Sequence, residues 1–356
     1  MKTHFVGTIK EGEPFDSVFI VDSISTKEKK DGNVFWILVL KDKGGLIEGK
    51  VWDASSFTEG PPCAGEFIKV RAEASMYKGK LGLTLRKVRR LDPTRQDDAL
   101  EFTYDDFVPV GPLNRFLLIE DLRMVFEKTV THPGLHAVCQ HVFTDPELHM
   151  CLRDAPAAGT IHQPYIGGLL EHVSNQCALT LAVVQGVYGY DTLTYDLLMS
   201  ACLLHDIGKI RELKWSTGIG YTDEGSLIGH VAISLEMVDR MRLVYWDAVG
   251  REHEREVAEV AEIDYSVPAI DWKAKHERNA NIWMHLRHII ASHHGQKDWG
   301  ACKEPASREA NLFHLIDMME SRMGMFDQID QKETFDAEGF TPWNARLNGR
   351  AWRMPV

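Results

Sequence analysis

The sequence of 356 residues contains no long apolar run. No stretch approaches the roughly 20 consecutive apolar residues that a membrane-spanning helix needs. The opening residues, MKTHFVGTIKEGEPF, lack the apolar core of a secretory signal peptide. We therefore expect a cytoplasmic protein that does not enter a membrane.

Cysteine is scarce and scattered. The six cysteines lie at positions 63, 139, 151, 177, 202 and 302 and form no CxxC pair. This spacing favours reduced thiols, mostly core residues, over disulfides or a zinc–thiolate site. Internal repeats and low-complexity segments are also lacking, so the sequence does not predict a repeat protein or a disordered chain.

Positive charge is in deficit over the whole chain, whose formal net charge is −12. This balance argues against a nucleic-acid partner for the chain taken as a whole. The charge is unevenly spread, however, because residues 1–91 hold 16 Lys and Arg against 12 Asp and Glu, a net +4, which leaves −16 for the rest. This distribution fits a basic module joined to an acidic one, but chance explains an excess of +4 about equally well.

The first 91 residues have the pattern of a small β-barrel. Short runs rich in β-branched and aromatic residues lie at 15–24, 34–42, 46–53, 66–75 and 80–88. Turn residues separate these runs, and Tyr77-Lys78-Gly79-Lys80 is a strong hairpin signal. Five strands with a longer link between the third and fourth predict an OB-fold, with an SH3-like barrel as the structural alternative.

The rest of the chain divides into a linker and a helical region. Residues 92–111 are acidic, contain Pro93 and show no sustained helical period, so we expect a linker there. The predicted helices are 113–128, 132–142, 166–187, 193–206, 226–246, 281–293 and 307–324. The sequence thus predicts two domains, an all-β OB-fold at 1–91 and an all-α domain at 112–326. A charged insertion at 250–280 and a C-terminal tail at 327–356 complete the prediction.

Histidine and aspartate residues recur near the ends of the predicted helices. His205-Asp206 follows the run 197–204, which is apolar almost all round and therefore predicts a buried helix. Burying an imidazole and a carboxylate there is costly unless they are paired or bind a metal. Lys209 falls one helical turn later and could face the same site. Asp317, in another apolar stretch, needs a partner for the same reason.

Four more histidines extend this pattern in the helical region: His172, His230, His293 and His294. A single histidine of this kind is more often an ordinary core or surface residue, but the set in its order and helical setting indicates a metal site. Imidazole and carboxylate ligands without thiolates favour manganese, iron, magnesium or zinc in five- or six-coordinate sites over structural zinc.

Five segments carry a resemblance to a known family. GGLLEHV (167–173), ACLLHDIGKIREL (201–213), YTDEGSLIGHV (221–231), IIASHHGQKDWG (289–300) and the helix with Asp317 resemble, in this order, the motifs of HD-superfamily phosphohydrolases. Together with KDGNVFWILVLKDKGGLIEGKVWD (30–53), the chain over about 14–325 resembles the YhaM-type 3′–5′ exoribonucleases, in which an OB-fold precedes the HD domain. The segment 250–280 departs from the family, because it is longer than the resemblance implies.

The resemblance implies roles for single residues. The core ligands of a divalent metal would be His172, His205, Asp206 and Asp317. Asp206 would bridge the ions if two bind, His230 and His293 would be the additional ligands, and Lys209 would contact the phosphate. His294 would be either a further ligand or the proton donor to the leaving oxygen. We expect two divalent metal ions at this site. Manganese is the expected metal, and iron, magnesium, zinc and cobalt are the alternatives.

The β-module offers candidates for nucleic-acid binding, since OB-folds stack bases on aromatic side chains while Lys and Arg follow the phosphates. The predicted contact residues are Trp36, Trp52, Arg71, Tyr77 and Lys78. Strand alternation allows only one of Phe35 and Trp36 to face outward. Barrel aromatics are more often core residues than binding residues, so each of these assignments competes with a purely structural role.

Three functions remain open on the sequence. The first is a metal-dependent 3′–5′ exonuclease that hydrolyses single-stranded RNA, or also DNA, to nucleoside monophosphates, with mode and polarity implied by the resemblance alone. The second is an HD phosphohydrolase that acts on nucleotides or cyclic dinucleotides. The third is a non-catalytic nucleic-acid-binding protein on a decayed HD scaffold, which the intact ligand positions disfavour. The sequence leaves the oligomeric state open, with a homo-oligomer among the options.

Overall fold

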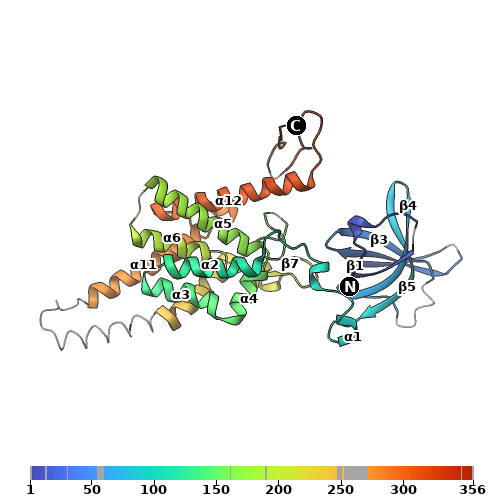
Figure 1. The fold of residues 1–356 in the computed structure, drawn as a ribbon, viewed down its shortest axis with the longest axis horizontal. Coiled ribbons are helices and arrows are strands. Elements are labelled where there is room, and N and C mark those ends of the chain that lie inside the picture. Colours follow the sequence, from blue (N-terminus) through green and yellow to red (C-terminus); the bar gives the residue numbers. More distant parts are fainter. Residues whose placement is uncertain are drawn as a thin grey trace. The chain divides into compact units, whose positions relative to one another are not determined.

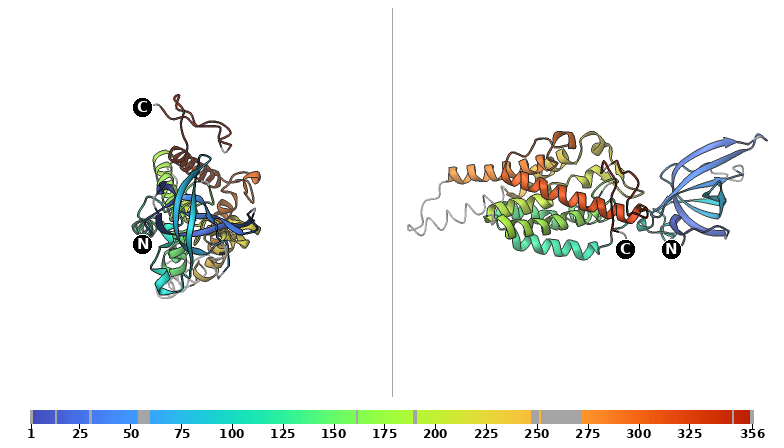
Figure 2. Two further views of the ribbon diagram at one scale, coloured as in Figure 1. Left: turned by 90° about the vertical axis from the view of Figure 1, so that its right-hand side faces the viewer. Right: turned by 90° about the horizontal axis from the view of Figure 1, so that it is seen from above.

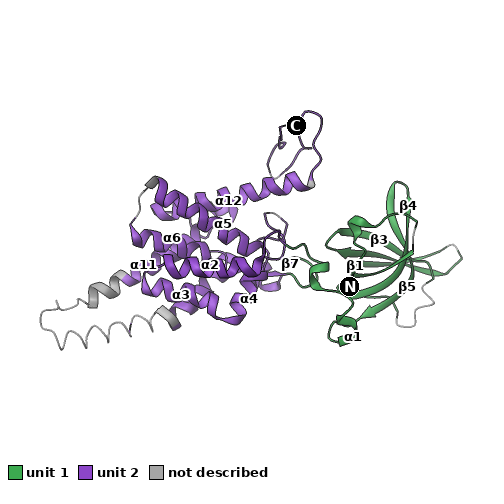
Figure 3. Ribbon diagram, in the orientation of Figure 1, with its two compact units in different colours: residues 1–110, 215–219 green, residues 111–214, 220–356 purple. Residues whose placement is uncertain are grey.

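The computed structural model describes residues 2–12, 14–29, 31–53, 60–160, 162–188, 191–246, 251, 272–345 and 347–354. The chain forms two compact units (Figure 3). Unit 1 comprises residues 1–110 and 215–219, and unit 2 comprises residues 111–214 and 220–356. In the part of the chain that the structure describes, no helix is both long enough and apolar enough to cross a membrane.

Unit 1 is a five-stranded closed barrel (Figure 1). Its strands are β1 (Pro14–Glu28), β2 (Val34–Asp42), β3 (Gly45–Val51), β4 (Phe67–Tyr77) and β5 (Lys80–Leu91). They close in the order β1-β2-β3-β5-β4, and β3 pairs with β5 in parallel while the other pairs are antiparallel. This is the strand order of an OB-fold, and the prediction of that fold is confirmed.

The hairpin at 77–80 and the alternation of side chains on β2 are both present in the barrel. The hairpin at 77–80 is confirmed, because Tyr77 pairs with Lys80 across a turn in which Lys78 and Gly79 both have positive φ. On β2, the alternation is also confirmed, but it places Trp36 in the core with 5% of its surface exposed. Phe35 therefore faces outward, and the prediction that Trp36 contacts nucleic acid is wrong.

Residues 92–110 pack on the barrel instead of forming a free linker. They contain the short helix α1 (Gln96–Ala99) and the 3-10 turn η3 (Tyr104–Asp106). Phe102 and Phe107 are buried against Phe67 of β4, with ring centroids 4.6 and 5.1 Å from that ring. The acidic composition predicted a linker, but the free energy gained by burying two phenylalanine rings outweighs the preference of the acidic side chains for water.

Unit 2 is helical, as predicted. Its longer helices are α2 (Arg115–Thr129), α3 (Pro133–Thr144), α4 (Pro146–Asp154), α5 (Gly168–Val183), α6 (Thr192–Leu204), α9 (His230–Met241), α11 (Trp272–Ser292) and α12 (Arg308–Lys332). Shorter elements are the helices α7 (Lys209–Glu212) and α8 (Asp223–Leu227), the strands β6 (Leu213–Lys214) and β7 (Gly220–Tyr221), the π-helical turns η4 (Val184–Tyr188) and η5 (Arg242–Trp246), and the 3-10 turn η6 (Lys297–Trp299). Helix α12 contacts α5, α6 and α11, and α6 contacts α5 and α11. The long helices of unit 2 run roughly along one direction (Figure 2).

The structure differs from the predicted helices at three points. The helix expected at 226–246 is divided into α8 and α9, because Gly229 adopts a φ of 81° between them. Helix α4 was not among the predicted helices, and Asp145 caps it by accepting hydrogen bonds from Glu147 N and Leu148 N. Helix α12 continues to Lys332, beyond the predicted end at 324.

The expected insertion and tail are described only in part. Of the segment 250–280, residues 250 and 252–271 lie outside the described residues, and 272–280 belong to α11. Of the tail 327–356, the first six residues complete α12, and the following chain folds back through bridges between Phe340 and Trp352 and between Asn344 and Gly349. Met325 and Ile329 of α12 are buried together with Ala351.

Candidate metal centre

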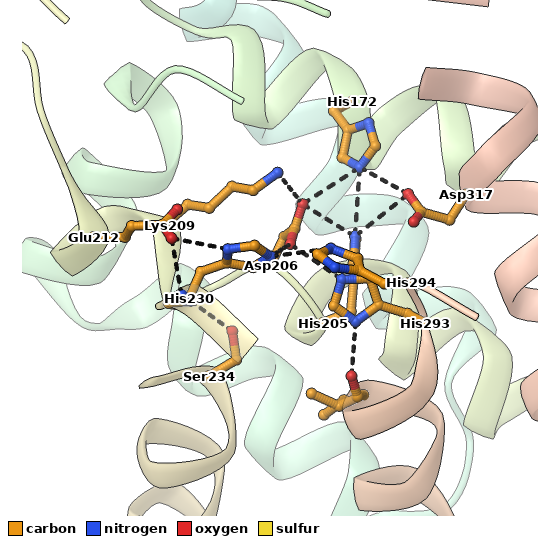
Figure 4. A network of polar contacts seen from close by, with 12 residues as sticks. His172, His205, Asp206, Lys209, Glu212, His230, Ser234, His293, His294 and Asp317 are labelled. Carbon is orange, nitrogen blue, oxygen red and sulfur yellow. Dashed lines mark hydrogen bonds and ion pairs between the residues drawn. The ribbon is translucent and has the colours of Figure 1, made fainter. Parts of the chain in front are cut away.

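Five elements of unit 2 bring the predicted metal ligands to one place (Figure 4). Helix α5 supplies His172 from its second turn. His205 and Asp206 follow the buried helix α6, and α9 begins with His230. His293 and His294 follow α11, and α12 supplies Asp317. The side chains of these seven residues point toward one another, and His172, His205, Asp206 and His293 are almost completely buried.

All five histidines use Nδ1 for an acceptor in the protein. The acceptors are Glu320 for His172, Ala201 O for His205 (3.1 Å), Glu212 for His230 (3.0 Å), Ile290 O for His293 (2.7 Å) and Trp299 O for His294 (2.8 Å). Carbonyl and carboxylate oxygens only accept, so each Nδ1 carries a proton. In the neutral ring this leaves the Nε2 lone pair free, which is the form in which histidine binds a metal.

Asp206 lies between two groups of ligand atoms. Its Oδ2 is 3.3 Å from His205 Nε2 and 3.6 Å from His172 Nε2. Its Oδ1 is 3.3 Å from His230 Nε2 and 3.6 Å from His293 Nε2. Within each group, His172-His205-Asp206 and His230-His293-His294, one ligand atom per residue lies within 4.8 Å of the others. The carboxylate thus has one oxygen for each group.

Asp317 and His294 complete the two groups. Asp317 Oδ1 is 3.4 Å from His172 Nε2 and 3.9 Å from His205 Nε2, so it belongs to the first group. His294 Nε2 is 3.2 Å from His230 Nε2 and belongs to the second. The six predicted ligands are therefore brought together, along with His294, for which the sequence left a ligand and a proton-donor role open.

Two buried atoms of the cluster lack a partner. Among the described residues, neither Asp206 Oδ1 nor His293 Nε2 has a hydrogen bond. A buried polar atom without a partner costs about 1–3 kcal/mol, and more when it is charged. A divalent cation satisfies a carboxylate oxygen and an imidazole lone pair at once, so these residues fit a metal site.

The electrostatics of the cluster favour a cation in the first group. Burial would lower the pKa of His172, but the carboxylates of Asp317 and Glu320 outweigh it and raise that pKa to about 10. Burial would raise the pKa of the Asp206 and Asp317 carboxyls, yet the surrounding cationic groups hold both pKa values below the ordinary range. The carboxylates therefore stay ionised and attract positive charge.

The second group is different, because it is dominated by imidazoles. Burial lowers the pKa of His293 and His294, so both rings stay neutral at physiological pH. A neutral His294 with its proton on Nδ1 has a lone pair, not a proton, at Nε2. This geometry favours a ligand over a proton donor at His294.

Lys209 lies beside the cluster, on the turn after Asp206, as the helical spacing predicted. It is 7% exposed, and its Nζ is 2.5 Å from Asp206 Oδ2. Burial would lower its pKa, but the charge of Asp206 outweighs this and raises the pKa. The ammonium therefore stays charged at the wall of the pocket that it shares with Asp206 and His294.

Gly208 allows the turn after Asp206 to pack closely against the start of α9. Its amide donates to Ser234 Oγ of α9 at 2.8 Å. A Cβ at this position would lie 2.4 Å from His230 O and 2.6 Å from Ser234 N, closer than real contacts allow. Only glycine lets the chain after Asp206 approach the start of α9, which holds His230 in the second group.

Sequence reasoning missed three buried residues that orient the ligands. Glu320 accepts from Gln163 and Asn175 as well as from His172, Glu212 accepts from both the amide and Nδ1 of His230, and Gln176 donates to Asp317 Oδ1 at 2.7 Å. Glu320 and Gln176 lie three and four residues after the ligands Asp317 and His172 on the same helices. That spacing could have indicated both of them.

His162 is a further residue that the sequence did not single out. It lines the same pocket as Lys209, and its ring centroid lies 5.6 Å from that of His172. Burial and the charges of Lys209 and His172 lower the pKa of His162 to about 3, so the ring is neutral.

On the barrel, three of the predicted contact residues lie near one another. Trp52 is 45% exposed and stacks on Phe35 with ring centroids 5.1 Å apart. Lys50 lies over both Trp52 and Tyr77, at 5.8 and 5.6 Å from their ring centroids, and Lys78 also lies over Tyr77. We call Phe35, Lys50, Trp52, Tyr77 and Lys78 the aromatic–lysine surface.

Arg71, the remaining predicted contact, is exposed on β4 opposite Lys87 of β5. Among the described residues, no contact joins Arg71 to the aromatic–lysine surface. Phe35 and Lys50 were not among the predicted contacts but belong to this surface, whereas the buried Trp36 does not.

The comparisons with known proteins agree with the geometry. Residues 176–321 match the model of the HD domain family. The chain is 29% identical over 318 residues to the 3′–5′ exoribonuclease YhaM of Bacillus velezensis, covering 89% of this chain and 88% of that protein. It is 28% identical to the YhaM proteins of Bacillus subtilis, with coverages of 89% and 88%, and of a Geobacillus species, with coverages of 97% and 93%.

A solved structure is also similar to part of the chain. The second OB-fold domain of replication protein A from Methanococcus maripaludis covers 26% of this chain and 98% of its own length, with 15% identity and a TM-score of 0.22. The assignment of the OB-fold rests on the strand order of the barrel and not on this similarity. The chain thus combines an OB-fold barrel with a segment that matches the HD domain family, and it is similar to the YhaM exoribonucleases along about nine tenths of its sequence.

Proposed function

We propose that this protein is a metal-dependent nuclease that degrades single-stranded RNA from its 3′ end and releases nucleoside monophosphates. The observation that carries the proposal is the placement of Asp206 between two groups of imidazole ligands, with Lys209 beside it. Similarity to the YhaM exoribonucleases supports the RNA substrate and the 3′–5′ polarity. Single-stranded DNA is a further candidate substrate.

The proposed metal ligands are the seven clustered residues. His172, His205 and Asp317 would hold one divalent ion, and His230, His293 and His294 a second, with one oxygen of Asp206 for each. When bound, such ions offset the negative charge of a phosphodiester and lower the pKa of water. Manganese is our choice of ion on ligand type, ahead of iron, magnesium, zinc and cobalt.

The protein's own groups prepare the phosphate site. The ammonium of Lys209 stays charged at the pocket wall, where it can stabilise negative charge that grows on the non-bridging phosphate oxygens. Glu320 and Glu212 hold the rings of His172 and His230 through Nδ1, which keeps Nε2 of each ring directed at the cluster. The buried setting keeps these groups fixed before substrate arrives.

In this proposal the barrel binds the single strand. The aromatic–lysine surface combines two exposed rings, Trp52 and Tyr77, with the lysines that lie over them. Aromatic platforms beside lysines are the means by which OB-folds hold single strands with little sequence preference. Residues 1–91, which contain this surface, also carry the net charge of +4.

The test separates the nuclease from a mononucleotide or cyclic-dinucleotide phosphohydrolase. A 30-nucleotide RNA labelled at its 5′ end, the same RNA labelled at its 3′ end, free nucleotides and a cyclic dinucleotide are each incubated with the protein and Mn²⁺. We expect a ladder of shortening products from the 5′-labelled RNA and immediate release of a labelled monophosphate from the 3′-labelled RNA. Consumption of the nucleotides with the RNA left intact would contradict the proposal.

A further inference from the structure

A pocket of about 200 Å³ opens at the metal-ligand cluster. Its lining includes Asp206, Lys209 and His294 of the cluster together with Trp299, His314 and Met318. The mechanism proposed above uses the first three residues, whereas it gives no role to the last three. Trp299 is unusual among these, because 53% of the surface of this large aromatic residue is exposed.

The position of Trp299 is fixed by its backbone. Its carbonyl oxygen accepts a hydrogen bond of 2.8 Å from Nδ1 of His294, so the residue is tied directly to a proposed metal ligand. Its amide donates to Gln296 O at 3.0 Å. The next residue, Gly300, adopts a φ of 98°, and a Cβ there would come within 3.0 Å of His294 Nδ1. The tight turn therefore holds the indole at the pocket while its backbone orients His294.

The chemistry of the pocket suggests what the exposed indole contacts. Lys209 and the metal-ligand cluster attract a phosphate, and the bases next to that phosphate extend from the same backbone. A base presents an aromatic face of the kind that stacks on tryptophan, and such stacking tolerates all four bases. His314 adds a second aromatic ring near the first, with centroids 6.3 Å apart.

We infer that Trp299 is the stacking platform for a base adjacent to the phosphodiester that is cleaved. This inference rests on the proposed nuclease function and makes it more specific, since it assigns a nucleobase subsite within unit 2 itself. Trp299 would hold a base at the end of the strand that is being cleaved.

The experiment compares RNA oligonucleotides that carry an abasic site. Three substrates are used: an intact 12-nucleotide RNA, one that lacks the 3′-terminal base and one that lacks the penultimate base. The wild-type protein should lose about 5- to 150-fold in kcat/KM on one of the two abasic substrates, which is the range for stacking one base on an aromatic side chain. Trp299→Ala should lose a similar factor on intact RNA and show no further loss on that abasic substrate. Trp299→Phe should fall between the two.

Trp343→Ala is the matched control, because Trp343 is another exposed tryptophan of unit 2, with 67% of its surface exposed, and does not line this pocket. It should show the wild-type ratio between intact and abasic RNA. Metal content and melting temperature identify a folding defect in Trp299→Ala, and in that case Trp299→Phe carries the comparison. Equal sensitivity to the abasic site in wild type and variants, or no sensitivity in wild type, would overturn the inference while RNA degradation continued. Failure of the wild-type protein to degrade any RNA would instead contradict the proposed function.

Discussion

The carboxylate of Glu320 offers a test of how the protein orients a proposed metal ligand. Glu320 is 4% exposed and accepts from three donors, namely Nδ1 of His172, Nε2 of Gln163 at 2.6 Å and Nδ2 of Asn175 at 3.0 Å. Glutamine has nearly the same shape but only one acceptor oxygen, and its amide nitrogen donates. In Glu320→Gln, therefore, at least one of the three donors must face another donor, whichever way the amide lies.

The expected loss of metal affinity follows from this mismatch. Partners that hold a ligating histidine typically contribute 10- to 100-fold to metal affinity. We expect Glu320→Gln to bind Mn²⁺ more weakly by this factor, about 1.4–2.7 kcal/mol. Isothermal titration calorimetry with metal-free protein measures it directly. The melting temperature of the metal-free variant shows whether the fold survives.

Glu171→Gln is the matched control for this prediction. Glu171 is a half-buried glutamate on α5 next to His172, and its side chain hydrogen-bonds to Tyr165 instead of a histidine ligand. Its Mn²⁺ affinity should stay within about twofold of wild type. An unchanged affinity in Glu320→Gln, or an equal loss in Glu171→Gln, would refute the role that we assign to Glu320.

Four further predictions concern other parts of the molecule. Lys209→Met should keep its metal and slow hydrolysis about 10²–10³-fold, the effect of losing one electrostatic contact in the transition state; loss of metal would make Lys209 structural. Trp52→Ala should weaken RNA binding about 5- to 150-fold in a filter-binding assay, without unfolding the barrel. Trp36→Ala should instead lower the free energy of unfolding of the barrel by about 3–5 kcal/mol, as measured by denaturant titration. Gly208→Ala should destabilise unit 2 by about 1–3 kcal/mol and reduce metal stoichiometry, because the new Cβ meets the start of α9; wild-type values for both would contradict this packing. The pKa of His172 is raised to about 10 from an ordinary 6.5, so its protonated ring stabilises the metal-free fold fully below about pH 6.5, and this stabilisation is lost as the pH rises through 10. Binding of Mn²⁺ at pH 8 should therefore release the proton of His172, which calorimetry detects as a binding enthalpy that depends on the buffer. Absence of proton release would refute this prediction.

Much of the candidate site could be predicted because its residues lie in ordered motifs. The buried helix before His205-Asp206 and the resemblance of the ordered segments to HD motifs predicted six of the seven proposed ligands and left His294 open between a ligand and a proton donor. The partners of those ligands could not be predicted in the same way. Whether Nδ1 of a histidine meets a carboxylate or a carbonyl depends on how α5, α9 and α12 pack, which a linear sequence does not specify.

The barrel shows a similar limit. Alternation correctly required one of Phe35 and Trp36 to face inward, but the choice depends on the register of β2 against β1 and β3. Trp36 pairs with Val51 on β3 and is buried, which leaves Phe35 to stack on the exposed Trp52. Segment 92–111 was predicted as a linker because it is acidic, contains a proline and shows no helical period. The buried side chains of Phe102 and Phe107 instead pack residues 92–110 on the barrel.

The central claim is that the histidine–aspartate cluster binds two divalent ions with Asp206 between them. Anomalous diffraction from crystals of the full chain grown with Mn²⁺ tests it most directly. The account predicts two manganese peaks, one among His172, His205 and Asp317 and one among His230, His293 and His294, with an oxygen of Asp206 facing each. Manganese at another place in a protein that degrades RNA, or a single peak that leaves one group of ligands empty, would contradict it.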